Sequence, residues 1–134
     1  MTNPFRDQEQ FMQICEQTTT GLNDSQFNLY LNLIQEETSE LAAAVAAQNN
    51  VDTLDALVDI LVVTIGAIHS MGADAEGAWK EVMRTNFAKV QIPEGKPLRR
   101  EDGKILKPAN WVPPDLKPYL SKSVTKDTNN WVEP

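Results

Sequence analysis

Two groups of carboxylates are the side chains in this sequence best placed to do chemistry. Glu36, Glu37 and Glu40 fall within little more than one helical turn, and their i, i+3 and i, i+4 spacings make them neighbours on one helix face. Asp55 and Asp59 are separated by one helical turn in the next apolar segment. Asp59 leads directly into an apolar run, and a charge that enters a buried segment needs an opposite charge or a metal ion.

A divalent cation is the simplest partner for these acids. Between Thr38 and Met71 the only basic side chain is His69, well beyond Asp59. Ligands that are all oxygen suit magnesium, manganese or calcium. A di-iron bundle would need Glu-x-x-His pairs, and Gly66 stands three residues before the single histidine. His69 is therefore expected to be packed or helix-terminal rather than a ligand.

The acidic residues can also be explained in part without a metal ion. A charge run on a helix is usually a solvated face, and this applies to the segment from Glu36 to Glu40. Asp52 and Asp55 have the spacing of an N-cap and N3 pair, so Asp55 alone is explained by a positive helix end. Asp59 lies too far along the helix for that explanation.

Two polar residues interrupt the apolar stripe of the last helical segment. Asn86 projects into the stripe and Lys89 lies at its edge. A buried amide needs hydrogen-bond partners, which another helix or a ligand can supply. Downstream, five basic residues lie between Gln91 and Lys107. The Asp102-Gly103 pair predicts a hairpin with a type I′ turn, which is either a surface hairpin or a basic arm that closes over a polyphosphate.

Four helices are needed to position these residues. The apolar periodicity and the capping residues predict helices over about 4–18, 23–48, 52–71 and 74–90. In the first, Phe5, Phe11, Met12 and Cys15 are expected to face inward. Seven of the eight prolines lie beyond Val90, so an irregular arm follows. The predicted fold class is all-α: an antiparallel bundle of about four helices with a Pro-rich C-terminal arm.

Composition excludes several classes of protein. A length of 134 residues is one ordinary domain, and one cysteine rules out an internal disulfide. A formal net charge of -7 argues against a nucleic-acid partner. No apolar run has the length of a membrane span, and the polar start lacks the pattern of a signal peptide. We therefore expect a cytoplasmic protein with no membrane partner.

Four motifs in one order resemble the all-α nucleoside triphosphate pyrophosphohydrolases, a superfamily that includes MazG, dimeric dUTPases and phosphoribosyl-ATP pyrophosphohydrolase. The sequence EETSEL at 36–41 is similar to the E-E-x-x-E-L signature, and LDALVDIL at 54–61 to the second acidic motif. VMRTNFAK at 82–89 is similar to R-S-N-x-S-K, and REDGKILKPAN at 100–110 to the E-D-G-K-x-x-K-G-P-N tail of MazG-like members. The chain departs from the pattern at Ala56, where a glutamate is usual, and Asp55 substitutes from one position earlier.

The resemblance implies a helical domain over residues 1–116, followed by a polar tail over 117–134. It implies hydrolysis of a nucleoside triphosphate to a monophosphate and pyrophosphate by a water molecule activated by Mg²⁺, with Mn²⁺ as an alternative. The implied metal ligands, which include the catalytic acids, are Glu36, Glu37, Glu40, Asp55 and Asp59. The implied substrate-binding residues are Asn86, Lys89, Lys104, Lys107 and Asn110.

The segment that follows Asp59 also bears on assembly. Ile60, Leu61, Val62, Val63 and Ile65 point in every direction around a helix axis, which predicts burial on all sides. A chain this short covers only part of such a helix, so we expect a homodimer or a dimer of dimers with Ile60 and Val63 at the interface. Two other functions stay open: a phosphoribosyl-ATP pyrophosphohydrolase and a non-catalytic helical interaction protein.

Overall fold

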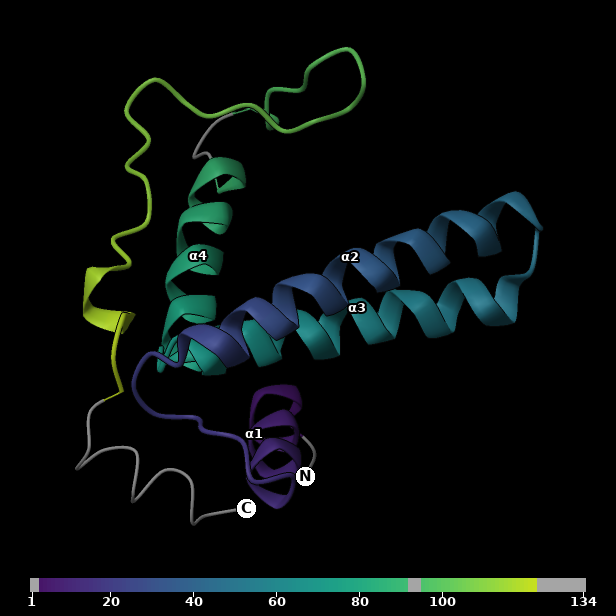
Figure 1. Cartoon of the computed structure of the whole chain (residues 1–134). Helices are drawn as coiled ribbons and strands as arrows, with labels where there is room; N and C mark the ends of the chain where they lie inside the picture. The colour runs from purple at the N-terminus through teal and green to yellow at the C-terminus, as the bar shows by residue number, and fades with distance from the viewer. Residues whose placement is uncertain (1–2, 92–94, 123–134) are drawn as a thin grey trace. The chain divides into compact units, whose positions relative to one another are not determined.

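The protein is all-α, as predicted. The computed structural model describes residues 3–91 and 95–122. Its helices are α1 (Pro4–Ile14), α2 (Asp24–Ala46), α3 (Asn50–Ser70) and α4 (Ala75–Val90), followed by a short 3₁₀ helix, η1 (Lys117–Tyr119) (Figure 1). Within these residues no β-strand is present beyond one isolated antiparallel bridge. None of the described helices combines the length and apolarity needed to span a bilayer.

The chain divides into two compact units. The first comprises Met1–Ala75 and Leu120–Pro134, and the second comprises Glu76–Tyr119. The predicted division of the sequence after Leu116 remains a prediction, and the tail beyond Lys122 lies outside the described residues. Each unit has its own internal contacts.

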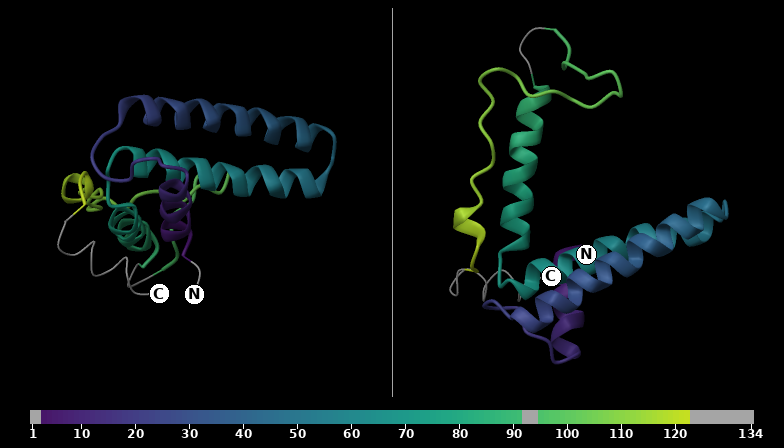
Figure 2. Two further views of the ribbon diagram at one scale, coloured as in Figure 1. Left: turned by 60° about the horizontal axis from the view of Figure 1, so that its bottom comes forward. Right: turned by 45° about the horizontal axis from the view of Figure 1, so that its top comes forward.

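The long helices α2 and α3 lie side by side and antiparallel in every view of the first unit (Figures 1 and 2). A very short connection joins them, which enforces this arrangement. Gln48 in the connection has a positive φ of 56°, and Asn49 then caps α3 by accepting a hydrogen bond from the backbone N–H of Asp52 at 3.0 Å. The prediction that Asp52 is the N-cap was wrong: Asp52 is the N3 residue, and its carboxylate accepts from the Asn49 amide at 2.8 Å.

Helix α1 is shorter than predicted and buries less of its surface. It ends at Ile14, because Glu16 adopts a positive φ of 62° and the chain turns away. Met12 is fully buried against Tyr30, Val63 and Ala67, as expected of an inward residue. Phe11 and Cys15 are exposed, contrary to prediction.

Helix α3 is not buried on all sides within one chain. Val63 belongs to the core cluster, whereas Leu61 is 62% exposed and Val62 also reaches the surface. The prediction of Val63 as an interface residue was therefore wrong, because its own chain already covers it. Close packing of α2 on α3 depends on Gly66, where an added Cβ would lie 2.6 Å from Cδ1 of the Tyr30 ring.

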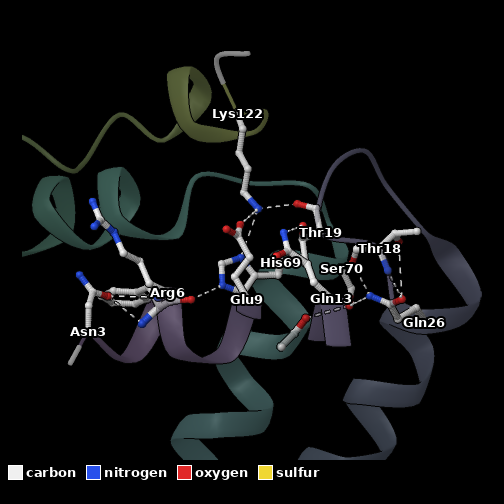
Figure 3. Close-up of polar contacts among 12 residues, drawn as sticks. Asn3, Arg6, Glu9, Gln13, Thr18, Thr19, Gln26, His69, Ser70 and Lys122 are labelled. Carbon is white, nitrogen blue, oxygen red and sulfur yellow. Dashed lines mark hydrogen bonds and ion pairs between the residues drawn. The ribbon is translucent and has the colours of Figure 1, made fainter. Parts of the chain in front are cut away.

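A buried polar network fastens the C-terminal end of the described chain to α1 and α3 (Figure 3). The Lys122 ammonium lies 2.8 Å from Oε2 of Glu9, and it also donates to the Thr19 carbonyl oxygen. Nε2 of His69 lies 2.8 Å from the Phe5 carbonyl oxygen, which can only accept, so Nε2 carries the proton. Nδ1 is then the acceptor that faces Lys122 at 3.3 Å. His69 is fully buried in this network, which confirms the expectation of a packed residue.

The second unit contains α4 and the basic arm. Residues 98–106 form a tight hairpin, with the Arg100 N–H bonded to the Lys104 carbonyl at 2.7 Å and the Leu106 N–H to the Leu98 carbonyl at 2.8 Å. The predicted type I′ turn was wrong, because in this turn only Gly103 has a positive φ. A turn followed by one left-handed glycine is the three-residue hairpin loop, which places Gly103 in a bulge.

Candidate functional site

The two acidic groups of the sequence meet across α2 and α3. Glu37 and Glu40 come from α2, and Asp55 and Asp59 come from α3. A hydrogen bond between the carboxyl groups of Glu37 and Glu40 is the main cause that raises the pKa of Glu37 to about 7. Partial desolvation and the charges of Glu40, Asp59 and Asp55 raise this pKa further. The structure therefore brings four of the five predicted ligands into one electrostatic cluster.

The corrected start of α3 changes the interpretation of Asp55. Because Asn49 is the N-cap, Asp55 lies in the second turn and no longer occupies the N3 position. The macrodipole acts mainly within the first turn, so a helix end does not account for this carboxylate. Glu36, by contrast, is exposed and is not among the groups that raise the pKa of Glu37.

A groove opens beside these acids between α2 and α3. Its volume is about 400 Å³, and Glu40, Asp52 and Asp55 supply its polar walls. The remaining lining residues are small: Ala43, Ala44, Ala47 and Ala56. Ala56, which replaces the glutamate usual in the resembled motif, therefore widens the groove where a longer side chain would project.

The donor set of the cluster fits a hard divalent cation. Oε2 of Glu37 is buried and has no hydrogen-bond partner among the described residues. An unpaired buried carboxylate oxygen beside three further carboxylates calls for a cation, and oxygen ligands suit Mg²⁺ or Mn²⁺. Within residues 3–91 and 95–122, no three acidic, histidine or cysteine side chains are already drawn together as a complete ligand set. The chemistry fits, and binding would have to draw the carboxylates closer.

Asn86 and Lys89 bond to each other on α4. The Lys89 ammonium donates to Oδ1 of Asn86 at 3.1 Å, and the Asn86 amide contacts the sulfur of Met83 at 3.7 Å. The half-buried Asn86 amide thus finds part of its hydrogen bonding within its own helix. The sequence had indicated either another helix or a ligand as its partner. These residues belong to the second unit, whereas the acidic cluster belongs to the first.

The arm residues of the prediction have different surroundings. Lys107 lies over the indole ring of Trp111 at 4.9 Å from the centroid, and Lys89 lies over the same ring at 5.0 Å. Asn110 lines a cavity beside Trp111. Lys104 is exposed, and its backbone N–H donates to Asp102 at 3.2 Å. The structure thus groups Lys89, Lys107 and Asn110 around one aromatic side chain.

Sequence reasoning assigned no role to Trp111 or to Arg84. The indole N–H of Trp111 donates to the Thr85 carbonyl oxygen at 2.8 Å, which fastens the arm to α4. Arg84 forms a bidentate salt bridge with Glu81, in which Nε and Nη2 each donate to one carboxylate oxygen at 2.9 Å. The available signal was a tryptophan directly after a predicted substrate-binding residue, Asn110, in a Pro-rich segment.

The fold and the site define a class of protein: an all-α chain in which two antiparallel helices present facing carboxylates suited to a divalent cation. Residues 7–86 match the sequence model of the phosphoribosyl-ATP pyrophosphohydrolase family. The match covers more than half of the chain, and the chain belongs to this family, within the MazG-like nucleoside triphosphate pyrophosphohydrolase superfamily. No curated protein matches the chain.

Membership makes the protein a pyrophosphohydrolase of a superfamily whose members generally use divalent metals. All of the acidic cluster falls inside the matched range. Lys89 and the arm fall outside it, so the match says nothing about their roles.

Proposed function

We propose that this protein hydrolyses a nucleoside triphosphate to a nucleoside or deoxynucleoside monophosphate and pyrophosphate in a magnesium-dependent reaction. The observation that carries the proposal is the electrostatic cluster that Glu37 and Glu40 of α2 form with Asp55 and Asp59 of α3, with a raised pKa and an unpaired buried oxygen at Glu37. Clustered anions of this kind are unfavourable unless a cation joins them.

The acids of α2 and α3 would hold the metal, with Glu36 completing the set. Mg²⁺, or Mn²⁺ in its place, supplies charge neutralisation of the phosphates and a more acidic water. Among the protein groups, a carboxylate of the cluster would accept the proton of the attacking water.

The cationic and amide side chains of the second unit would bind the rest of the substrate. Lys89, Lys104 and Lys107 stabilise negative charge on the phosphates and on the departing pyrophosphate. Asn86 and Asn110 offer amide groups that donate to phosphate or sugar oxygens. These assignments rest on side-chain chemistry, on the resemblance of the motifs and, for Lys89 and Lys107, on their contacts with Trp111.

A second candidate substrate is phosphoribosyl-ATP. The family match favours it, because the matched model is that of phosphoribosyl-ATP pyrophosphohydrolase. The same bond type is cleaved and pyrophosphate is released, so the acidic cluster serves both reactions. The two candidates differ in what lies on the ribose and base side of the triphosphate.

Pyrophosphate release over a panel of nucleoside triphosphates, deoxynucleoside triphosphates and phosphoribosyl-ATP tests this proposal, with and without Mg²⁺. Asp59→Asn and Glu40→Gln are expected to lose at least about a hundredfold in kcat, in line with losing a metal ligand or its orientation. Asp24→Asn, a change at the exposed start of α2, is the matched control. Release that is independent of metal, or full activity in Asp59→Asn, would contradict the site.

We also propose that the protein works in the cytoplasm as a homodimer or a dimer of dimers, without a nucleic-acid partner. Leu54, Leu57, Val58 and Leu61 are exposed along α3, and a contiguous apolar face of this kind marks an interaction surface. A two-fold axis would bury the face symmetrically. Leu61→Asp should give a monomer in sedimentation, whereas Gln10→Asp, at an exposed polar position on α1, should not; a monomeric unmodified chain at micromolar concentration would contradict the dimer.

A further inference from the structure

The chain leaves the first compact unit and later returns to it. Residues 76–119 form the second unit, and from Leu120 onward the chain belongs to the first unit again. The second unit carries all the residues proposed above to bind the substrate, whereas the acids proposed to bind the metal lie in the first. A substrate that needs both sets therefore depends on how the two connections between the units are held.

The outgoing connection is fastened by the loop between α1 and α2. The backbone N–H of Asn23 in this loop donates to the Ser70 carbonyl oxygen at 2.9 Å. Gly21 packs directly against Gly72, where an added Cβ would lie 2.7 Å from the Gly21 Cα. Ala75, the first residue of α4, is only 2% exposed. The chain thus enters the second unit from a fixed point.

The returning connection is fastened by Lys122. Its ammonium group has three N–H donors, and three acceptors face it: Oε2 of Glu9 at 2.8 Å, the Thr19 carbonyl oxygen, and Nδ1 of His69 at 3.3 Å (Figure 3). The lysine side chain is 3% exposed. A primary ammonium group therefore finds one acceptor for each N–H, and one acceptor carries the opposite charge. Thr19 belongs to the same loop that fastens the outgoing connection.

Hydrogen bonds inside the second unit leave little slack before this lysine. The Trp111 indole is bonded to α4, and the backbone N–H of Asp115 donates to Glu81 of α4 at 2.8 Å. Only residues 116–121 separate Asp115 from Lys122. A restraint at Lys122 therefore acts on the arm and, through these bonds, on α4.

We propose that Glu9, Thr19 and His69 form a binding site for a primary ammonium group, and that Lys122 in this site positions the second unit for the substrate. With both connections fastened at the α1–α2 loop, residues 76–119 are closed at both ends and have fewer accessible arrangements than a unit held at one end. Folding then contributes order that substrate binding would otherwise have to impose. The positioning role rests on the function proposed above, and the ammonium site does not.

The kinetics of Lys122→Ala and Lys122→Met test the positioning role, with Lys117→Ala at an exposed lysine of η1 as the matched control. Pyrophosphate release is measured with Mg²⁺ at a temperature at which circular dichroism shows each variant to be folded. Both Lys122 variants should raise KM about tenfold and leave kcat within about twofold of the control. A purely structural role would lower the active fraction, and hence kcat, at unchanged KM. That result would overturn the positioning role.

Added propylammonium separates the ammonium site from the chain connection. It supplies the atoms that Lys122→Ala removes, so it should raise the Tm of this variant, whereas propanol should not. Because the added amine is not joined to the chain, KM should stay raised. A Tm that does not respond would overturn the ammonium site. Restoration of KM by propylammonium would show that Lys122 acts only through the stability of the first unit, and would overturn the positioning role.

A distance measurement tests the positioning role without activity. Spin labels on the exposed Cys15 and on Gln91→Cys, directly after α4, report the spread of distances between the two units by pulsed EPR, with labelled chain diluted in unlabelled chain. Lys122→Ala should broaden this spread relative to Lys117→Ala, with or without propylammonium. An equal spread would overturn the role of Lys122. If the unmodified chain hydrolyses no nucleotide, the proposed function fails, and the distance spread and the Tm still decide the role of Lys122.

Discussion

Replacing Lys122 by methionine should destabilise the protein strongly, although the sequence predicts no functional role for this residue. The Lys122 and Glu9 side chains are only 3% and 8% exposed, and their charged atoms lie 2.8 Å apart. Methionine keeps the length of the side chain but removes the charge and its donors. Glu9 would then be a buried carboxylate without its cation, which typically costs about 3–5 kcal/mol.

Other contacts of the ammonium group support a value in that range. Lys122 also donates to the Thr19 carbonyl and to Nδ1 of His69, and these buried acceptors lose their donor in the variant. For a chain of 134 residues, a loss of about 4 kcal/mol corresponds to a fall in Tm of roughly 10–15 °C. The stability loss caused by Lys122→Met cannot exceed the free energy with which the C-terminal segment binds to the rest of the first unit. If that segment detached, Glu9 would return to water and its desolvation cost would disappear.

Thermal and urea unfolding of Lys122→Met, Glu9→Gln and the double variant would measure the pair by a double-mutant cycle. Lys117→Met, at an exposed lysine in η1, is the control. Limited proteolysis then distinguishes global loss of stability from release of the C-terminal segment alone. A Lys122→Met protein that matches the control in both measurements would refute the reasoning.

Three further predictions concern the first unit. Gly66→Ala should lower the free energy of unfolding by about 1–3 kcal/mol, because the new Cβ would enter the space of the Tyr30 ring; chemical denaturation measures this. Gln26→Leu should cost about 2–3 kcal/mol, since its amide donates to the Ser70 hydroxyl at 2.8 Å and also pairs with the backbone of the preceding loop. Without metal, Tm should fall as pH rises from about 4.5 to about 7, because the pKa of Glu37 is raised from 4.5 to about 7 and its stabilising proton is lost across that window.

Exposed positions on the same helices provide controls for these three predictions. Thr64→Ala on α3 and Gln35→Leu on α2 change solvent-facing side chains and should leave the free energy of unfolding nearly unchanged. Glu37→Gln should flatten the dependence of Tm on pH, since an amide does not titrate. A slope that persists unchanged in Glu37→Gln would assign the titration to another group.

The sequence predicted the elements better than their ends. Strong apolar periodicity and Asn23 located α2, because both signals are local. The start of α3 was misplaced because Asn49 and Asp52 are both good capping residues, spaced so that each can bond to the other. Which one is the N-cap depends on how α3 packs, and that is not a local property.

Contacts between distant residues explain what could not be predicted. When a helix is apolar on all sides, its sequence does not indicate which face is buried. Nothing in the sequence therefore distinguished buried Val63 from exposed Leu61. Lys122 and Glu9 are 113 residues apart, and a lysine near a chain end ordinarily predicts a solvated side chain. The acidic cluster was predictable because helical spacing placed acids on two consecutive helices that a short connection makes antiparallel.

The electrostatics of that cluster link stability, proton binding and metal binding. A raised pKa means that folded Glu37 holds a proton at pH values where the unfolded chain has released it. A divalent cation removes the same repulsion without the proton, so metal and proton compete for the cluster. It follows that Mg²⁺ should stabilise the fold increasingly as pH rises through about 7 and only weakly near pH 5. The repulsion among the carboxylates that destabilises the metal-free fold at neutral pH is therefore the source of metal affinity. Glu37→Gln removes part of this repulsion, so it should raise Tm in the absence of metal and weaken the stabilisation by Mg²⁺.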